Sequence, residues 1–299
     1  MKILLGVDGS HYSDEAIRFV SRFPFPVTPD IVLVHACLSP DYTYSEFGIP
    51  VDMTHLMDLA RKEGERILAE ASKKCESWAN SVKTELLFDA VPGQAIVKAA
   101  TKNNVDLIVA GARGMGAVER FLIGSVSEAI VKYSPCSTLI VRPLKREAAN
   151  NDWKILIADD DSIEANQGIQ RIAESRFHPD SQLRLMTVLN TFHEFHAEFT
   201  LQQGPELTML LEKTQHRLNR KAESLKETTA VVTTLIKESP DASKRILSEA
   251  EQFKPDLIVI GSTGKSGWKR AILGSVSHRV LHHSVCSVLI ERKRPGVQD

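Results

Sequence analysis

The sequence predicts two tandem α/β domains, each built on a doubly wound, five-stranded parallel sheet. Three observations lead to this prediction. The chain has 299 residues, about twice the ~150 residues of an average domain. Its second half repeats its first half. Within each half, short apolar segments alternate with segments of helical periodicity, an order that places helices on both faces of a parallel sheet.

The repeat is clearest near the end of each half. Leu107–Arg142 and Leu257–Arg292 align without a gap at an offset of 150, with 16 identities in 36 positions. The starts of the halves also correspond, because Lys2–Ser10 (KILLGVDGS) matches Lys154–Ser162 (KILIADDDS) at an offset of 152. The repeating unit is therefore a whole domain and not a short solenoid repeat.

The joint between the halves is polar and begins with Pro143, as PLKREAANND. This composition is typical of a linker. We expect a first domain, a linker and a second domain at residues 1–143, 144–152 and 153–294. Because the halves are copies, we expect them to pack as a pseudo-two-fold pair, a covalent version of a homodimer, with the apolar last strands as edges that need covering.

The first half alternates strands and helices in order. Five apolar segments predict buried strands, namely Ile3–Val7, Ile31–Ala36, Thr84–Phe88, Leu107–Ala110 and Thr138–Val141. Helical spacing of apolar residues predicts helices at Ser13–Arg22 and His55–Ser81. Pro92 suits the first turn of a third helix, and Ser125 is a candidate N-cap of a fourth.

The second half repeats this plan. Strands are expected near Ile155, Leu183, Val231, Leu257 and Val288, and helices near Ser162, Leu207, Asp241 and Ser275. Doubly wound sheets bind ligands at the carboxyl ends of their strands, where the strand order reverses. The loops after the first and fourth strands of each half are therefore the candidate sites.

The composition is that of an ordinary globular protein. Hydrophobic residues make up 42% of the chain and charged residues 25%, which argues against the disordered and fibrous classes. The 37 basic and 38 acidic residues are balanced within each half, so we expect neither a nucleic-acid partner nor a membrane surface. Apolar runs reach about six residues, far short of the ~20 that span a bilayer. Widely spaced cysteines and an early acidic residue, too soon for a signal peptide, favour a cytoplasmic protein.

A glycine loop follows the fourth strand of each half. The motif Gly-x-x-Gly, nine residues and Gly-Ser occurs at Gly111, Gly114, Gly124 and Ser125, and again at Gly261, Gly264, Gly274 and Ser275. Glycines let a ligand approach bare backbone, and a helix start offers N–H groups and the positive end of the helix dipole to an anion. The motif is a candidate phosphate cradle, and the alternative is a pair of tight turns followed by a helix cap.

These residues resemble the universal stress protein family. The glycine motif, between an apolar strand and a helix, is similar to the nucleotide-binding signature of that family. The aspartate that ends the first strand (GVDGS) and the segment SPCSTLIVR before the last strand also resemble it. The resemblance covers nearly the whole chain twice, as in a tandem member. It implies an adenine-nucleotide alpha-hydrolase-like fold with strand order 3-2-1-4-5 in each half.

The resemblance also implies a site for ATP, or for ADP or AMP, in each half. In ATP-binding members, the loop glycines and serine hold the phosphates and ribose, the strand-one aspartate meets the nucleoside, and the backbone after strand two meets adenine. The matching residues of the first half are Asp8, Ala36, Ala110, Gly111, Arg113, Gly114, Gly124, Ser125 and Val126. Those of the second half are Asp160, Val188, Ile260, Gly261, Gly264, Gly274, Ser275 and Val276.

The second half departs from this pattern in charge. Asp160 lies in a run of three aspartates, where the first half has Val7, Asp8 and Gly9. Three carboxylates repel a triphosphate unless a cation such as Mg²⁺ bridges them. We therefore expect the second half to bind ATP only with a divalent cation. The alternative is that the outer two aspartates face solvent or cap the next helix.

The second glycine loop is also bulkier and more basic. Lys265 and Trp268 stand where the first half has Met115 and Val118. Their bulk could close the second site, or basic residues of this loop could pair with phosphates, namely Lys265, Lys269 and Arg270.

Other motifs are weaker. The sequence lacks a P-loop, a dinucleotide fingerprint and a Gly-x-Ser-x-Gly elbow. Two histidine pairs lack an evident third ligand, so we expect no metal site; they are His193 with His196, and His282 with His283. We expect no reactive thiol among the cysteines, which are Cys37, Cys75, Cys136 and Cys286. The segments 39–53 and 191–205 are long loops, either lids over a nucleotide or variable connectors.

The leading hypothesis is a cytoplasmic stress-response protein that binds ATP or another adenine nucleotide. It would sense the nucleotide and change a partner interaction or its own assembly. No base or water-orienting residue is evident, so any ATP hydrolysis should be slow. One alternative is an enzyme that hydrolyses ATP slowly or adenylates a substrate, and another is an interaction module with empty sites. The stress-response role rests on the resemblance alone.

Overall fold

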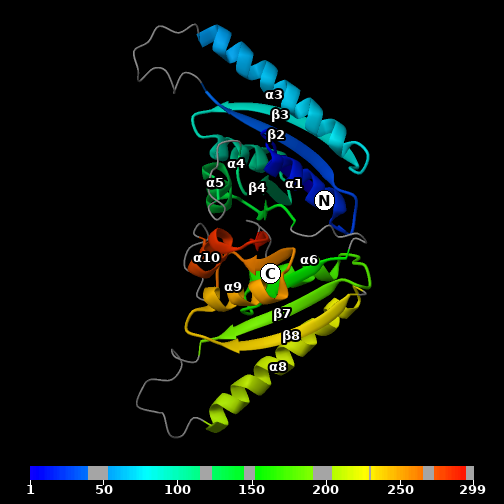
Figure 1. Cartoon of the computed structure of the whole chain (residues 1–299), viewed down its shortest axis with the longest axis vertical. Helices are drawn as coiled ribbons and strands as arrows, with labels where there is room; N and C mark the ends of the chain where they lie inside the picture. The colour runs from blue at the N-terminus through cyan, green and yellow to red at the C-terminus, as the bar shows by residue number, and fades with distance from the viewer. Residues whose placement is uncertain are drawn as a thin grey trace. The chain divides into compact units, whose positions relative to one another are not determined.

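The computed structural model describes residues 1–39, 53–114, 123–144, 152–190, 204–228, 230–264 and 273–293. The chain divides into two compact units, and the division falls between Pro143 and Leu144. Both units alternate strands and helices along the chain (Figure 1).

The first unit contains a five-stranded sheet. Its strands are β1 (Lys2–Gly6), β2 (Asp30–Leu38), β3 (Ser81–Asp89), β4 (Leu107–Gly111) and β5 (Ser137–Val141). Its helices within the described residues are α1 (His11–Arg22), α3 (Met53–Cys75), α4 (Pro92–Asn103) and α5 (Ser125–Tyr133). The strands are parallel and lie in the order β3-β2-β1-β4-β5.

The second unit has the same plan. Its strands are β6 (Lys154–Ala158), β7 (Gln182–Leu189), β8 (Val231–Glu238), β9 (Leu257–Gly261) and β10 (Ser287–Glu291). Its described helices are α6 (Ile163–Ala173), α8 (Gly204–Lys226), α9 (Ala242–Phe253) and α10 (Ser275–His283). The parallel order β8-β7-β6-β9-β10 corresponds to 3-2-1-4-5, so the expected fold class and strand order are confirmed in both units.

Helices cover both faces of each sheet (Figure 1). In the first unit α1 and α3 pack on one face, and α4 and α5 on the other. In the second unit α6 and α8 form one layer, and α9 and α10 the other. This two-sided cover explains the continuous apolar strands, because a residue on either face of the sheet is buried. In β1, for example, Ile3, Leu4 and Leu5 are all buried.

One helix ends earlier than its apolar periodicity predicts. The expected helix reached Ser81, whereas α3 ends at Cys75 and Ser81 opens β3. The Asn80 N–H donates to the carbonyl of Pro29 at 2.9 Å, and Ser81 pairs with Asp30 on β2. Strand pairing therefore overrides helical propensity after Cys75, because backbone groups at the sheet edge need hydrogen-bond partners.

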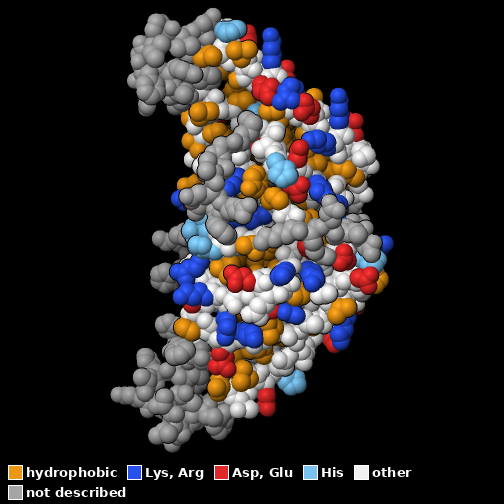
Figure 2. Space-filling model, in the orientation of Figure 1, with side chains coloured by type: hydrophobic (Ala, Val, Ile, Leu, Met, Phe, Trp, Pro, Cys, Tyr) orange, Lys and Arg blue, Asp and Glu red, His pale blue; other side chains and the backbone are white. Residues whose placement is uncertain are grey.

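The charge pattern of the visible surface agrees with the balanced composition. Figure 2 shows Lys and Arg side chains interspersed with Asp and Glu side chains.

Among the described helices, none is both long enough and apolar enough to cross a bilayer.

Candidate functional site

The strand order of each unit reverses at its first strand. β1 pairs with β2 on one side and with β4 on the other, so the loops after β1 and β4 leave adjacent strands at the same edge. β6 lies in the same way between β7 and β9. Parallel sheets bind ligands at this point, because neighbouring connections run to opposite faces there and leave a crevice.

A cavity of about 360 Å³ occupies this point in the first unit. All nine residues predicted for the first site line it: Asp8, Ala36, Ala110, Gly111, Arg113, Gly114, Gly124, Ser125 and Val126. Sequence reasoning missed further lining residues from β1, α1, α4 and α5, namely Gly6, Val7, Ser13, Pro92, Ile96 and Ser127.

The second unit has a cavity of about 280 Å³ at the equivalent point. Its lining includes all eight predicted residues: Asp160, Val188, Ile260, Gly261, Gly264, Gly274, Ser275 and Val276. The missed lining residues are Ala158, Asp159, Met186, Ala242, Ile246, Thr263 and Ser277. Both volumes are near the lower end of the range of small-molecule sites, roughly 300–1,000 Å³.

Most of the missed residues carry no motif, but one pair does. Ser127 and Ser277 lie in the sequence GSVS, which both halves contain. The Ser127 hydroxyl donates to the Gly111 carbonyl at 2.7 Å, and the Ser277 hydroxyl donates to the Gly261 carbonyl at 2.6 Å. These hydrogen bonds tie the first turn of α5 or α10 to the end of β4 or β9, and so help to fix the cavity wall.

The helices that begin at the cavity have no side-chain cap. Ser125 was the expected N-cap, but the cap is Gly124, and Ser125 is the first helical residue; Gly274 and Ser275 are arranged alike. Neither glycine has a side chain to accept a hydrogen bond from the first turn. The N–H groups of these turns therefore remain available to an anion, in the positive field of the helix end.

The loop glycines are required by space and not by conformation. Among the described glycines the positive φ belongs to Gly9, at 75°, and not to a glycine of these loops. A Cβ at Gly111 would lie 2.7 Å from the backbone of Tyr12, and one at Gly114 would lie 2.6 Å from Asp8 Oδ2. The absence of a side chain lets the loop close against α1 and against the strand-one aspartate.

Asp8 and Asp160 hold equivalent positions after the first strands. Asp8 Oδ1 accepts a hydrogen bond from the Ser10 N–H at 3.0 Å, and Asp160 Oδ1 accepts one from the Ser162 N–H at 3.1 Å. Each carboxylate thus uses one oxygen to shape its own turn. Its Oδ2 lies on the side of the glycine loop, next to Gly114 or Gly264.

The residues predicted to follow strand two lie within it. Ala36 is inside β2 and Val188 is inside β7, near the carboxyl end of each strand. The preceding residues hold the end of strand one: His35 Nδ1 lies 2.7 Å from the carbonyl oxygen of Val7, and the Thr187 hydroxyl donates to the carbonyl of Asp159 at 2.9 Å. The strand continues because its backbone pairs with β3 or β8 beyond this point.

The extra aspartates of the second unit do not face the cavity as unpaired charges. Asp159 is 3% exposed, and Lys221 Nζ of α8 lies 2.7 Å from its carboxylate and 2.9 Å from that of Asp161. Arg217 lies 3.8 Å from Asp159 and 3.6 Å from Asp161. The expectation that Asp159 faces solvent is therefore wrong, and two cations of α8 offset the charges of the two carboxylates.

Several sequence predictions lie outside the described residues. They concern the glycine-loop residues Met115, Val118, Lys265, Trp268, Lys269 and Arg270, the histidines His193 and His196, and most of the loops 39–53 and 191–205.

All four cysteines lie in the part of the chain that the structure describes. Cys75, Cys136 and Cys286 are buried, and Cys37 is half-buried. Burial raises the pKa of the Cys75 thiol to about 12 and also raises that of Cys37. A raised pKa leaves little thiolate at neutral pH, so these two thiols are poor nucleophiles.

Both halves of the chain resemble known proteins. The family model of the universal stress proteins matches residues 1–142 and again residues 153–292. The chain belongs to the universal stress protein family. A universal stress protein of Methanocaldococcus jannaschii is 30% identical over 148 residues, which cover 49% of this chain and 84% of that protein.

Solved universal stress proteins resemble the chain in structure. One from Archaeoglobus fulgidus has a TM-score of 0.66 at 20% identity and covers 97% of this chain and 98% of its own, which shows the shared fold. Another, solved in complex with cAMP, has a TM-score of 0.34 at 21% identity and covers 48% of this chain and 96% of its own.

Proposed function

We propose that this universal stress protein binds an adenine nucleotide such as ATP in each of its two cavities. The observation that carries the proposal is the position of the cavities. In both units a cavity at the strand-order reversal is lined by every residue that the family resemblance assigned to the nucleotide. Membership of the family supports a role in the stress response.

The chemistry of the lining fits the parts of such a ligand. Uncapped first turns of α5 and α10 present N–H groups suited to phosphate oxygens. Asp8 and Asp160 are acceptors suited to the hydroxyl or amino groups of a nucleoside. Apolar side chains of Ile96 and Ile246, which line the walls, suit the faces of a base.

We propose that the bound nucleotide acts as a signal in the cytoplasm. Occupancy would change an interaction with a regulatory protein or with a second copy of the chain. A ligand shifts such an equilibrium only by binding one state more tightly than the other. The partner-binding state is then expected to differ in nucleotide affinity.

Mass analysis of nucleotide released from freshly purified, denatured protein tests the proposal directly. We expect an adenine nucleotide. Calorimetric titration of nucleotide-free protein with ATP, ADP, AMP and cAMP then ranks the ligands, and chromatography of the ATP mixture detects hydrolysis. No released nucleotide and no heat with any of the four would overturn the proposal.

Substitution of one loop glycine in each unit assigns the sites. We expect Gly114→Ala to weaken binding in the first unit roughly tenfold or more, about 1.4 kcal/mol, because its Cβ would meet Asp8 Oδ2 at 2.6 Å. Gly264→Ala should weaken the second site less, because its Cβ would lie 3.2 Å from Asp160 Oδ2. Unchanged titrations for both variants would contradict the site assignment.

Magnesium is expected to affect both sites alike. The ion pairs of Asp159 and Asp161 with α8 remove the reason for a cation requirement confined to the second unit. Asp8 and Asp160 are left as equivalent carboxylates that could join a phosphate-bound Mg²⁺. ATP titrations of Gly114→Ala and Gly264→Ala, each with magnesium and with excess chelator, compare the effect of magnesium when one site or the other is weakened. Chelator sensitivity of the second site alone would contradict this expectation.

A further inference from the structure

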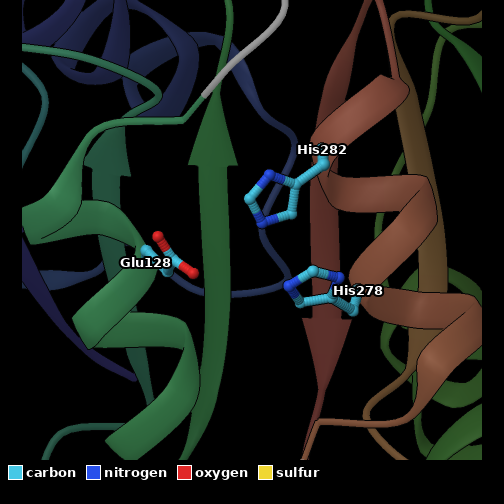
Figure 3. Close-up of side chains that lie close together, drawn as sticks. All are labelled: Glu128, His278 and His282. Atoms are coloured by element: carbon cyan, nitrogen blue, oxygen red, sulfur yellow. The ribbon is translucent and has the colours of Figure 1, made fainter.

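Two histidines lie next to each other on α10 of the second unit. His278 and His282 are four residues apart, which places them on one side of a helix. Their ring centroids are 4.3 Å apart, with 33° between the ring planes. Figure 3 shows both imidazole rings on the same side of α10. The sequence analysis had paired His282 with its neighbour His283, which the helix turns toward another side.

The separation of the rings suits coordination of one metal ion. A ring nitrogen of His278 and one of His282 lie within 4.8 Å of each other. Two nitrogens bound to one tetrahedral Zn²⁺ at about 2.0–2.1 Å stand roughly 3.4 Å apart, a distance that a small rotation of the exposed His278 side chain can reach. His278 is exposed and His282 is half-buried, so an ion can enter from solvent.

The surroundings on the helix also suit a cation. Arg279, the nearest positive residue in sequence, is held toward α9, where its guanidinium lies 2.7 Å from Asp241 Oδ2 and 3.3 Å from the Ser243 hydroxyl. His282 lies in the last turn of α10, where the helix dipole favours positive charge.

We infer that His278 and His282 form a binding site for a divalent transition-metal ion such as Zn²⁺, Cu²⁺ or Ni²⁺. Neutral imidazole is a preferred ligand of these ions, and paired histidines four residues apart on a helix are a common source of two zinc ligands. Two protein ligands leave coordination positions for water, so the ion exchanges with solvent. The inference goes beyond the proposed nucleotide site and does not depend on it.

The first unit provides an internal control for this site. At the offset of 150, α5 carries Glu128 and Lys132 where α10 carries His278 and His282. An ammonium group cannot coordinate a metal ion, so α5 lacks the paired ligands. The double substitution H278E/H282K therefore removes the site while using residues that the same helix accepts in the other half.

Zinc titration of the full chain tests the inference. Because protons compete with metal ions for imidazole nitrogens, the calorimetry is done at about pH 7.5. We expect H278A, H282A and H278E/H282K each to lose one equivalent of the Zn²⁺ that the wild-type chain binds. The matched control H283A removes an adjacent exposed histidine and should keep that equivalent. Equal zinc binding in wild type and H278A/H282A, or an equal loss in H283A, would overturn the inference.

Hydrogen exchange gives a second readout that general zinc binding would not change. An ion held across one helical turn should slow amide exchange within residues 275–283 of the wild-type protein. H278E/H282K should show no such slowing, and its exchange without zinc reports whether α10 is folded. Zinc-dependent protection of α10 in the variant, or none in the wild type, would contradict the proposed ligands.

Discussion

The two halves stabilise the same turn, after their first strands, by different means. In the first unit Gly9 adopts a φ of 75°, and a Cβ on it would lie 3.3 Å from Cγ1 of Ile67 on α3. In the second unit Asp161 takes this position with a φ of 64°, and its carboxylate pairs with Lys221 on α8. At this position the first unit therefore has a glycine next to an apolar side chain, and the second unit has an aspartate with a strained backbone that forms an ion pair.

The difference shows that a shared backbone does not require shared interactions. A non-glycine residue in the left-handed region costs about 1–3 kcal/mol, and a buried carboxylate such as Asp159 costs more unless it is paired. Lys221 offsets both costs, because it reaches the carboxylates of Asp159 and Asp161 together. The second unit should therefore depend on one side chain of α8 in a way that the first unit does not depend on α3.

Removal of that side chain should have the largest effect. We expect Lys221→Met to lower the free energy of unfolding of the second unit by about 3 kcal/mol, because it leaves a buried carboxylate without its closest cation. Urea unfolding followed by peptide-resolved hydrogen exchange measures each unit separately. The matched control is Lys213→Met, an exposed lysine on the same helix. Equal stability of the two variants would contradict the role given to Lys221.

Transfer of the first unit's residues should repair this loss. The triple substitution D159V/D161G/K221I gives the second unit the residues of Val7 and Gly9, and it replaces Lys221 of α8 with an apolar side chain such as the one that α3 places next to Gly9. Replacement of a buried ion pair by packed apolar residues is often neutral or stabilising. We expect the triple variant to unfold within about 1 kcal/mol of wild type. A loss as large as that of Lys221→Met would show that the two turns differ in more than these three residues.

The glycine after β4 should tolerate a methyl group less than the one after β9. A Cβ at Gly111 would lie 2.7 Å from backbone atoms of Tyr12, whereas one at Gly261 would lie 3.2 Å from Glu164 Cβ. We expect Gly111→Ala to destabilise the first unit by about 3 kcal/mol and Gly261→Ala to destabilise the second by about 1 kcal/mol. The same hydrogen-exchange measurement checks the order, and a reversed order would contradict it.

The helices after strand three begin differently in the two units. α4 begins at Pro92 after Val91 and has no side-chain cap, whereas Asp241 caps α9 through the N–H of Lys244 at 3.2 Å. The Ser243 hydroxyl, with the Lys244 N–H and the Arg279 guanidinium, holds the pKa of the Asp241 carboxyl below its usual value.

This cap should make α9 sensitive to acid. A lowered folded-state pKa means that the stabilisation is present above the unfolded pKa of about 3.9 and is lost as pH falls through the folded value. We expect Asp241→Ala to cost about 1 kcal/mol at pH 7 and less as the pH falls below 4. Asp241→Asn keeps a capping oxygen but does not titrate, so its α9 hydrogen exchange should vary less with pH. A pH-independent effect of Asp241→Ala would contradict this assignment.

The repeat and its periodicity were enough to predict the fold class. Strand order 3-2-1-4-5, both glycine loops and the aspartates Asp8 and Asp160 followed from the sequence and its resemblance to one family, and the structure gathers them around two cavities. The glycine loops and the aspartates are local patterns, which the duplication displays twice, whereas the strand order came from the resemblance. The sequence did not predict the exact helix ends. Serine is a residue type that caps helices well, yet the N-cap of α5 is Gly124, one residue before Ser125.

What the sequence by itself determined is therefore the class of fold and the place of the two cavities. What only the tertiary structure decided is which side chains meet there. The three adjacent aspartates after β6 predict mutual repulsion. The cation that pairs with two of them is Lys221 of α8, some sixty residues away in the chain. His278 and His282 likewise become neighbours only through the phase of α10. Periodicity fixes which face of an element is buried, whereas pairing between elements depends on strand register and helix packing, which no local pattern encodes.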